Sequence, residues 1–157
     1  MTDKNWSIYL SGEIHSNWRK EISNGIDKHK LPIETLSPIT NHSDSDDCGT
    51  HILGNEQDNF WRDHKSAKIN LIRNKTLIEG ADIVIVRFGE KYRQWNAAFD
   101  AGYAVASGIP LITLHDSELN HPLKEIDSMA LSVAETPEQI VNILLYVVGG
   151  KLMPIKN

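Results

Sequence analysis

The chain has 157 residues, 40% of them hydrophobic and 24% charged, enough for one globular domain that buries about two-thirds of its unfolded surface. Its formal net charge of -5 argues against nucleic acid as a partner, because a phosphate backbone is recognised by a basic surface. No segment has the pattern of a signal peptide or of a membrane span, and the single cysteine excludes an internal disulfide. We therefore expect a cytoplasmic protein with no membrane partner.

The first expected strand, residues 7–10, leads directly into a helix. The connecting turn, residues 11–16, reads SGEIHS, and its Ser16 is a suitable N-cap. Apolar residues then recur at every fourth position, the spacing of a helix face that packs on a core: Trp18, Ile22 and Ile26. Because a helix N-terminus attracts anions, the turn either binds a phosphate or sugar hydroxyl or is an ordinary βα turn. It has too few glycines for a dinucleotide or Walker motif, and we expect no cofactor.

Residues 33–36 are expected to form the second strand, and residues 41–58 a long polar loop. The loop contains potential metal ligands, among them His42, Asp44, Asp46, Asp47 and His51. Their spacing matches no compact ligand motif, and a solvated loop explains the same composition. We expect no metal, and a metal-dependent hydrolase built on these residues stays open as a third functional hypothesis. Long loops in compact domains are usually functional, so a lid over the ligand site is the expected role.

Residues 60–79 are expected to form a helix, or two helices with a break, because their apolar members keep helical spacing. Asp63, Asn70 and Asn74 share another face of that helix. This polar face is either exposed to solvent or forms a wall of the ligand site, with Arg73 beside it.

The central segment has the pattern of a βαβ unit. A buried strand, residues 81–86, precedes a polar loop, residues 87–93. An alanine-rich helix, residues 96–107, then leads to a second buried strand, residues 109–114. Ligands of open parallel sheets lie outside the carboxyl ends of the strands, so we expect the chemistry between residues 87 and 100.

After a fifth expected strand, residues 131–134, the last helix begins with a capping box. Thr136 is the N-cap, Pro137 is the first helical residue and Gln139 completes the box. Four apolar residues are expected to face the core: Ile140, Ile143, Leu144 and Val147. Three more widen the apolar surface and suggest the interface of a homo-oligomer: Val141, Leu145 and Val148. Five strands alternating with helices indicate a doubly wound α/β domain.

The chain resembles the YtoQ family in five segments: IYLSGEIHSNWRKEI (8–22), NHSDSDDCG (41–49), KINLIRN (68–74), FGEKYRQWNAAFDAGYA (88–104) and HPLKE (121–125). It is more distantly similar to the nucleoside 2-deoxyribosyltransferase superfamily, which includes the deoxynucleoside monophosphate N-glycosidases. The resemblance implies one three-layer, flavodoxin-like domain over residues 1–157, with a five-stranded parallel sheet of order 2-1-3-4-5. It also implies a small-molecule nucleoside or nucleotide as the ligand.

The same resemblance implies roles for single residues. The superfamily has a tyrosine on its first strand, and Tyr9 matches it. The phosphate-binding loop of its monophosphate branch matches residues 12–16, with His15 where a basic residue is expected. The catalytic glutamate, early in the helix before a G-x-A-x-x-x-G-x-P ending, matches Asp100, which is shorter by one C–C bond, about 1.5 Å. At one further position where the superfamily has an acid, this chain has Asn74. At another, where the superfamily has an acid or a serine, it has Gln94.

The helix that carries Asp100 and the segment before it contain further polar and aromatic residues that could contact a nucleoside. If Asn96 caps the helix, Asp100 lies near its start, where the helix dipole favours an ionised carboxylate. Asn96, Asp100 and Tyr103 share one face and could contact one sugar, while three aromatic residues could stack on a base: Phe88, Tyr92 and Trp95. The alternative is an amphipathic helix whose acid only caps it or faces solvent.

Two functional hypotheses follow. The first is an N-glycosidase or deoxyribosyltransferase in which Asp100 attacks the anomeric carbon and Glu13 or Asp46 protonates the leaving base. The second is a pocket that binds a nucleotide or sugar phosphate without catalysis. In either case we expect the following residues to bind the ligand: Tyr9, Gly12, His15, Ser16, His42, Arg73, Asn74, Arg87, Trp95 and Asn96.

Overall fold

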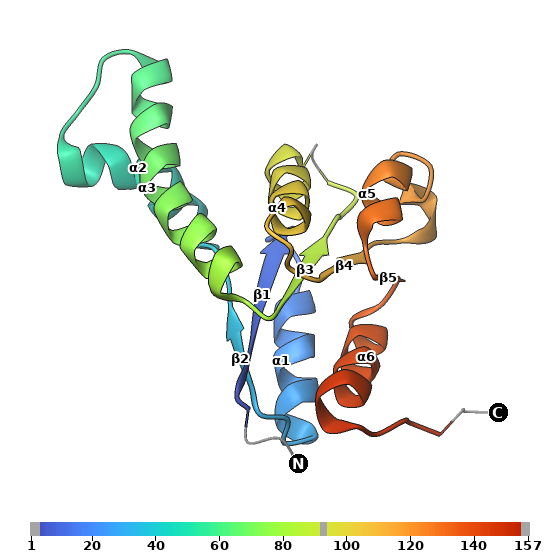
Figure 1. Ribbon diagram of the computed structural model, residues 1–157. Helices are drawn as coiled ribbons and strands as arrows, with labels where there is room; N and C mark the ends of the chain where they lie inside the picture. The colour runs from blue at the N-terminus through green and yellow to red at the C-terminus, as the bar shows by residue number, and fades with distance from the viewer. Residues whose placement is uncertain (1–3, 92–93, 155–157) are drawn as a thin grey trace.

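Five short strands form a parallel sheet in the order β2-β1-β3-β4-β5 (Figure 1). The computed structural model describes residues 4–91 and 94–154. The strands are β1 (Trp6–Gly12), β2 (Ile33–Leu36), β3 (Ile83–Arg87), β4 (Leu111–Leu114) and β5 (Ser132–Ala134). Each neighbouring pair is parallel. The predicted doubly wound α/β fold and its strand order are confirmed.

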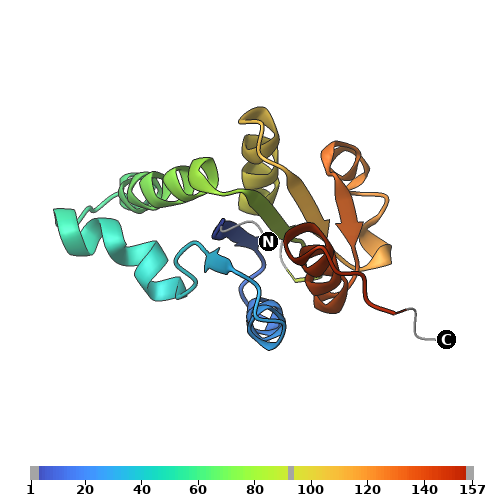
Figure 2. The ribbon, with the colours of Figure 1, turned by 60° about the horizontal axis from the view of Figure 1, so that its bottom comes forward.

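Helices cover both faces of the sheet (Figure 2). The helices α1 (Trp18–Lys28) and α6 (Pro137–Gly149) pack on one face through Ile8, Leu10 and Ile85. The other face carries Tyr9, Val84 and Val86, and is covered by α4 (Trp95–Ala106), α5 (Lys124–Met129) and the end of α3 (Asn59–Gly80). Successive residues of a strand point to opposite faces, so this alternation produces the three layers.

The last helix, α6, begins as predicted, but its apolar residues pack differently from the prediction. The Thr136 side chain accepts a hydrogen bond from the Gln139 N–H, and the reciprocal bond completes the capping box. Val141 and Leu145 are buried within the chain, whereas Val147 is 46% exposed. Val141 packs on Gly25 of α1, where a Cβ atom would lie 2.4 Å from its Cγ2.

The predicted core position of Val147 is therefore wrong, and so is the subunit interface predicted from Val141 and Leu145. The close approach of α1, which only a glycine at position 25 permits, turns the apolar face of α6 toward the neighbouring helix. Besides Val147 and Tyr146 of α6, exposed apolar side chains lie on other helices: Ile52, Leu53, Phe60, Trp61, Leu71, Ile72, Trp95 and Phe99. The homo-oligomer stays a prediction.

Residues 41–58 do not form the predicted loop, because His42–Leu53 is a helix, α2, and their role as a lid stays a prediction. The Asn41 side chain caps it by accepting the Asp44 N–H at 3.1 Å. With α3 it forms a helical arm that extends beyond the sheet (Figure 1). Gly49 allows the two helices to meet, since a Cβ atom there would lie 2.4 Å from the backbone N of Ser66.

Polar contacts join the two helices of the arm. Ser66 Oγ donates to the Asp46 carbonyl at 2.6 Å, and Asn70 Nδ2 donates to the Ser45 carbonyl at 2.8 Å. The segment whose polar composition suggested a loop is thus bound to another helix. These contacts join distant parts of the sequence. Within the described ranges, none of the helices is both long enough and apolar enough to cross a bilayer.

Candidate active site

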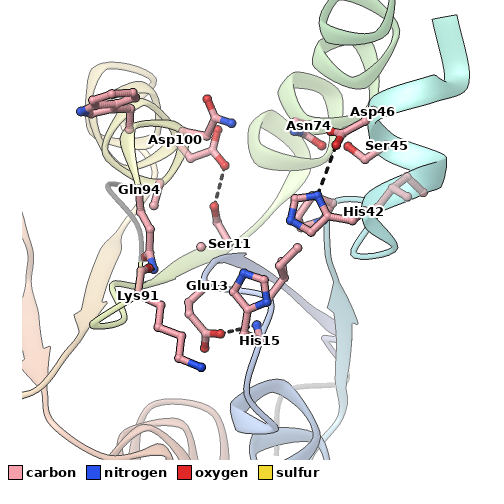
Figure 3. Close-up of a pocket in the computed structure, with 17 residues that line it drawn as sticks. Ser11, Glu13, His15, His42, Ser45, Asp46, Asn74, Lys91, Gln94 and Asp100 are labelled. Carbon is pink, nitrogen blue, oxygen red and sulfur yellow. Dashed lines mark hydrogen bonds and ion pairs between the residues drawn. The ribbon is translucent and has the colours of Figure 1, made fainter. Parts of the chain in front are cut away.

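An open pocket of about 540 Å³ lies at the carboxyl ends of β1 and β3 (Figure 3). The strand order reverses between these two strands, which is where ligands bind in doubly wound sheets. The turn after β1 and the first turns of α4 form one side of the pocket, and the N-terminus of α2 forms the other. Asn74 of α3 completes the wall between them.

Asp100 lies in the second turn of α4 and lines this pocket, although only 7% of the residue is exposed. Ser11, itself buried at the end of β1, donates its hydroxyl to Asp100 Oδ2 at 2.5 Å (Figure 3). Burial raises the pKa of Asp100, and the Ser11 hydrogen bond offsets part of that rise. Asn96 does not cap the helix, because α4 begins at Trp95 with Gln94 at its N-cap, and burial outweighs the influences that favour the ionised carboxylate.

Ser11→Ala should raise the pKa of Asp100 further, because the lost hydrogen bond stabilises the ionised carboxylate. The measurement is a ¹³C NMR titration of the aspartate carboxyl carbons, with Asp100→Asn to assign the resonance. Ser7→Ala is the matched control, since Ser7 lies on the same strand and donates to the Gly80 carbonyl. An unchanged Asp100 titration in Ser11→Ala would contradict the described contact.

Tyr9 lies two residues before Ser11 on the same strand and is completely buried. Its hydroxyl has no hydrogen-bond partner among the described residues. Burial raises its pKa, and the nearby negative charge of Asp100 adds to the effect. Tyr9 is therefore placed to influence Asp100 from beneath the pocket.

The turn after β1 depends on a glycine and an arginine. Gly12 has φ +105°, and a Cβ atom there would lie 2.0 Å from the Arg87 carbonyl oxygen. Arg19 donates from all three guanidinium nitrogens to the carbonyls of Leu10, Gly12 and Glu13. Burial lowers the pKa of Arg19 to about 10. Sequence reasoning missed Arg19, whose only signal is its place in the first turn of a helix that follows a strand.

Glu13 is 7% exposed and is bonded within the turn. Its carboxylate accepts hydrogen bonds from the His15 N–H and from Ser16 Oγ, the latter at 2.5 Å, and lies 3.5 Å from Arg87 Nε. Burial alone would raise the pKa of Glu13, but these hydrogen bonds and Arg87 lower it below its ordinary value. An ionised Glu13 is a poor proton donor to a leaving base.

The same contacts correct the predicted N-cap. Helix α1 begins at Trp18 with Asn17 at its N-cap, because the Ser16 hydroxyl donates to Glu13. Arg87 likewise faces Glu13, and its Nε atom is buried. Both side chains therefore stabilise the turn.

The side of the pocket formed by α2 carries His42 and Asp46. The His42 Nδ1 atom lies 3.3 Å from Asp46 Oδ2, and the His42 ring stacks on that of His15 at 5.8 Å between centroids (Figure 3). Asn74 Oδ1 is buried with no hydrogen-bond partner in the described part of the chain. A ligand hydroxyl or N–H group would satisfy this oxygen.

The first turn of α4 presents Trp95 and Asn96 to the pocket, and the Trp95 residue is 72% exposed. Gln94 closes the preceding loop by accepting the Gly89 N–H at 3.0 Å and donating to the Lys91 carbonyl at 3.1 Å.

Three other expected contacts differ from the prediction. Phe88 is packed in the core, Tyr103 donates its hydroxyl to Glu79, and the exposed Arg73 donates to the Ser37 carbonyl at 3.3 Å. None of these three residues lines the pocket. Tyr92 lies outside the described residues.

The metal hypothesis receives no support from the arrangement of side chains. Among residues 4–91 and 94–154, no three His, Cys, Asp or Glu side chains are grouped as a metal site. His51 follows His42 by nine positions on α2, about 13 Å along the helix axis.

A protein family and a bacterial relative match most of the chain. The family described as nucleoside 2-deoxyribosyltransferase YtoQ matches residues 9–148. The uncharacterized protein YtoQ of Bacillus subtilis (strain 168) is 46% identical over 139 residues, which cover 88% of this chain and 94% of that protein.

Solved structures show the same fold. A conserved protein from Enterococcus faecalis V583 aligns with a TM-score of 0.60 at 14% identity, over 88% of this chain and 96% of its own. A 2-deoxyribosyltransferase from Bacillus psychrosaccharolyticus aligns with a TM-score of 0.54 at 16% identity, over 96% of this chain and 99% of its own.

Proposed function

The chain belongs to the nucleoside 2-deoxyribosyltransferase YtoQ family, and from this premise we propose that it cleaves the N-glycosidic bond of a nucleoside or nucleoside 5′-monophosphate, with Asp100 as nucleophile. The observation that carries the proposal is the place of Asp100. It is a nearly buried carboxyl in the wall of a pocket of about 540 Å³, with one oxygen bound by Ser11. A pocket of this volume accommodates a small-molecule ligand.

The chemistry assigns a separate role to each oxygen of Asp100. Ser11 holds Oδ2, and Oδ1 is the proposed nucleophile that bonds to C1′ of the sugar. The C1′–N bond breaks, and its electron pair stays on the base nitrogen, which accepts a proton. Water or a second base then attacks C1′, which releases the sugar from Asp100. Attack by water corresponds to an N-glycosidase, and attack by a second base corresponds to a deoxyribosyltransferase.

Asp46 is the proposed source of the proton for the leaving base. It lines the side of the pocket opposite Asp100 and lies beside His42 (Figure 3). The exposed indole of Trp95 is a suitable surface for stacking of the base. Asn74 Oδ1, which lacks a partner among the described residues, would accept a hydrogen bond from the sugar or base.

Incubation with a panel of deoxyribonucleosides, ribonucleosides and their 5′-monophosphates tests the proposal. Free base is measured by liquid chromatography, with and without a second base as acceptor. Release of base supports the proposal, and appearance of a new nucleoside identifies transfer. A rise in melting temperature without release of base on any substrate would instead favour the non-catalytic pocket.

A further inference from the structure

We infer that the Glu13 carboxylate occupies the anion position of the turn after β1, so that the pocket accepts nucleosides and rejects their 5′-monophosphates. The inference rests on the proposed function and adds the phosphorylation state of its substrate. It assigns to Glu13 a role in specificity in place of proton transfer.

The hydrogen-bond donors of this turn point at the chain itself. A turn that leads from a strand into a helix binds phosphate when its N–H and hydroxyl groups point outward at the ligand. Here the His15 N–H donates to Glu13 Oε1 and the Ser16 hydroxyl donates to Glu13 Oε2. The donors that would surround a phosphate surround a carboxylate of the chain itself.

The two arginines near this turn contact groups of the turn itself. Arg87 Nε lies 3.5 Å from Glu13 Oε2, and the three guanidinium nitrogens of Arg19 donate to backbone carbonyls. Turning Arg19 toward a phosphate would leave buried carbonyls without a partner, and turning Arg87 away would remove the positive charge beside the buried Glu13 carboxylate; both changes are unfavourable. These two cations therefore neutralise and stabilise the turn itself.

The charged groups of the pocket also disfavour a phosphate. Its lining contains three carboxyl groups, those of Glu13, Asp46 and Asp100. Facing them are Lys91 and two histidines, His15 and His42, and His42 is paired with Asp46. A phosphate monoester brings nearly two negative charges at pH 7, and the Glu13 carboxylate lies where the turn would otherwise hold them.

The Glu13 side chain is held in place by the loop after β3. A Cβ atom at Gly89 would lie 2.6 Å from Glu13 Cγ, so the loop after β3 packs directly on the Glu13 side chain. Gln94 holds this loop through the Gly89 N–H. A bound 5′-phosphate would consequently meet a fixed carboxylate.

Calorimetric titration of the full chain tests the inference. The ligands are the four deoxynucleosides, their 5′-monophosphates and inorganic phosphate, and the variants are Glu13→Gln and Glu21→Gln. Glu21 is an exposed acid in the first turn of α1, so its variant has the same charge change without the turn contacts. We expect the wild type to bind a nucleoside at least tenfold more tightly than its monophosphate. Glu13→Gln should reduce this ratio at least tenfold, and Glu21→Gln should leave it unchanged.

The outcomes separate this inference from the proposed function. Equal or tighter binding of the monophosphates by the wild type would overturn the inference, whether or not Glu13→Gln folds, and would leave the proposed function intact. A nucleoside preference that Glu13→Gln preserves would overturn the role of Glu13. If no nucleoside or nucleotide binds, the proposed function fails. In that case the binding of inorganic phosphate tests the turn alone. If the wild type binds phosphate as tightly as the Glu13→Gln variant does, the inference is contradicted.

Discussion

Asp100→Asn should reduce release of base from the best nucleoside by a factor of about 10³ or more, since an amide cannot form the glycosyl ester. Asparagine keeps the size of the side chain, and its carbonyl oxygen can still accept the Ser11 hydroxyl. The measurement is kcat/KM from chromatography of the free base. Asp27→Asn, at an exposed position of α1, is the matched control and should keep full activity.

The stability of the same variant shows whether the loss lies in the chemistry. The pKa of Asp100 is raised in the folded chain, so between the ordinary aspartate pKa of 3.8 and this raised value the folded state binds more protons. Stability is therefore lost as the pH rises through that window, and the loss is complete above it. Asparagine has no such penalty, so the melting temperature of Asp100→Asn at pH 7 should equal or exceed that of the wild type. The difference should shrink below pH 3.8. Retention of a tenth or more of the activity would contradict the nucleophile assignment.

Gly12→Ala should lower the free energy of unfolding by roughly 2–4 kcal/mol, because both its backbone angle and its contact require glycine. The residue has φ +105°, and the added Cβ atom would lie 2.0 Å from the Arg87 carbonyl oxygen. That oxygen accepts the Glu13 N–H at 3.0 Å, so relief of the clash would separate β1 from β3 at the edge of the pocket. We expect a lower urea midpoint and weaker nucleoside binding.

Gly102→Ala is the matched control for this prediction. Gly102 lies inside α4, and a Cβ atom there would meet no heavy atom within 4 Å. Alanine favours the helix over glycine, so this variant should gain up to about 1 kcal/mol. If Gly12→Ala unfolds at the same urea concentration as the wild type, the close contact of the turn with Arg87 is incorrect.

Sequence reasoning succeeded where a pattern is local. The apolar runs at residues 81–86 and 109–114 identify buried strands because a strand buried on both faces needs apolar residues throughout. The capping box at Thr136 was visible because its partners lie three residues apart. The resemblance to the superfamily further implied the strand order, which the structure confirms.

Sequence reasoning failed where a residue's partner is distant in the chain. The polar segment that became α2 is stabilised by Ser66 and Asn70 of another helix, so its composition alone indicated a loop. Phe88 follows a strand and could be either a ligand contact or core, and only packing against α4 decided for the core.

By itself, the sequence determined the layered fold and the edge of the sheet where the pocket lies, because hydrophobic periodicity and caps act over a few neighbouring residues. The tertiary structure alone decided in which direction the pKa of each of two pocket acids shifts. Burial raises the pKa of Asp100, whereas hydrogen bonds from the turn and Arg87 lower that of Glu13. The reason is that the energy of a charged group depends on the water it loses on burial and on the hydrogen bonds and charges it gains. The segments that exclude the water and supply these partners include ones remote in the sequence.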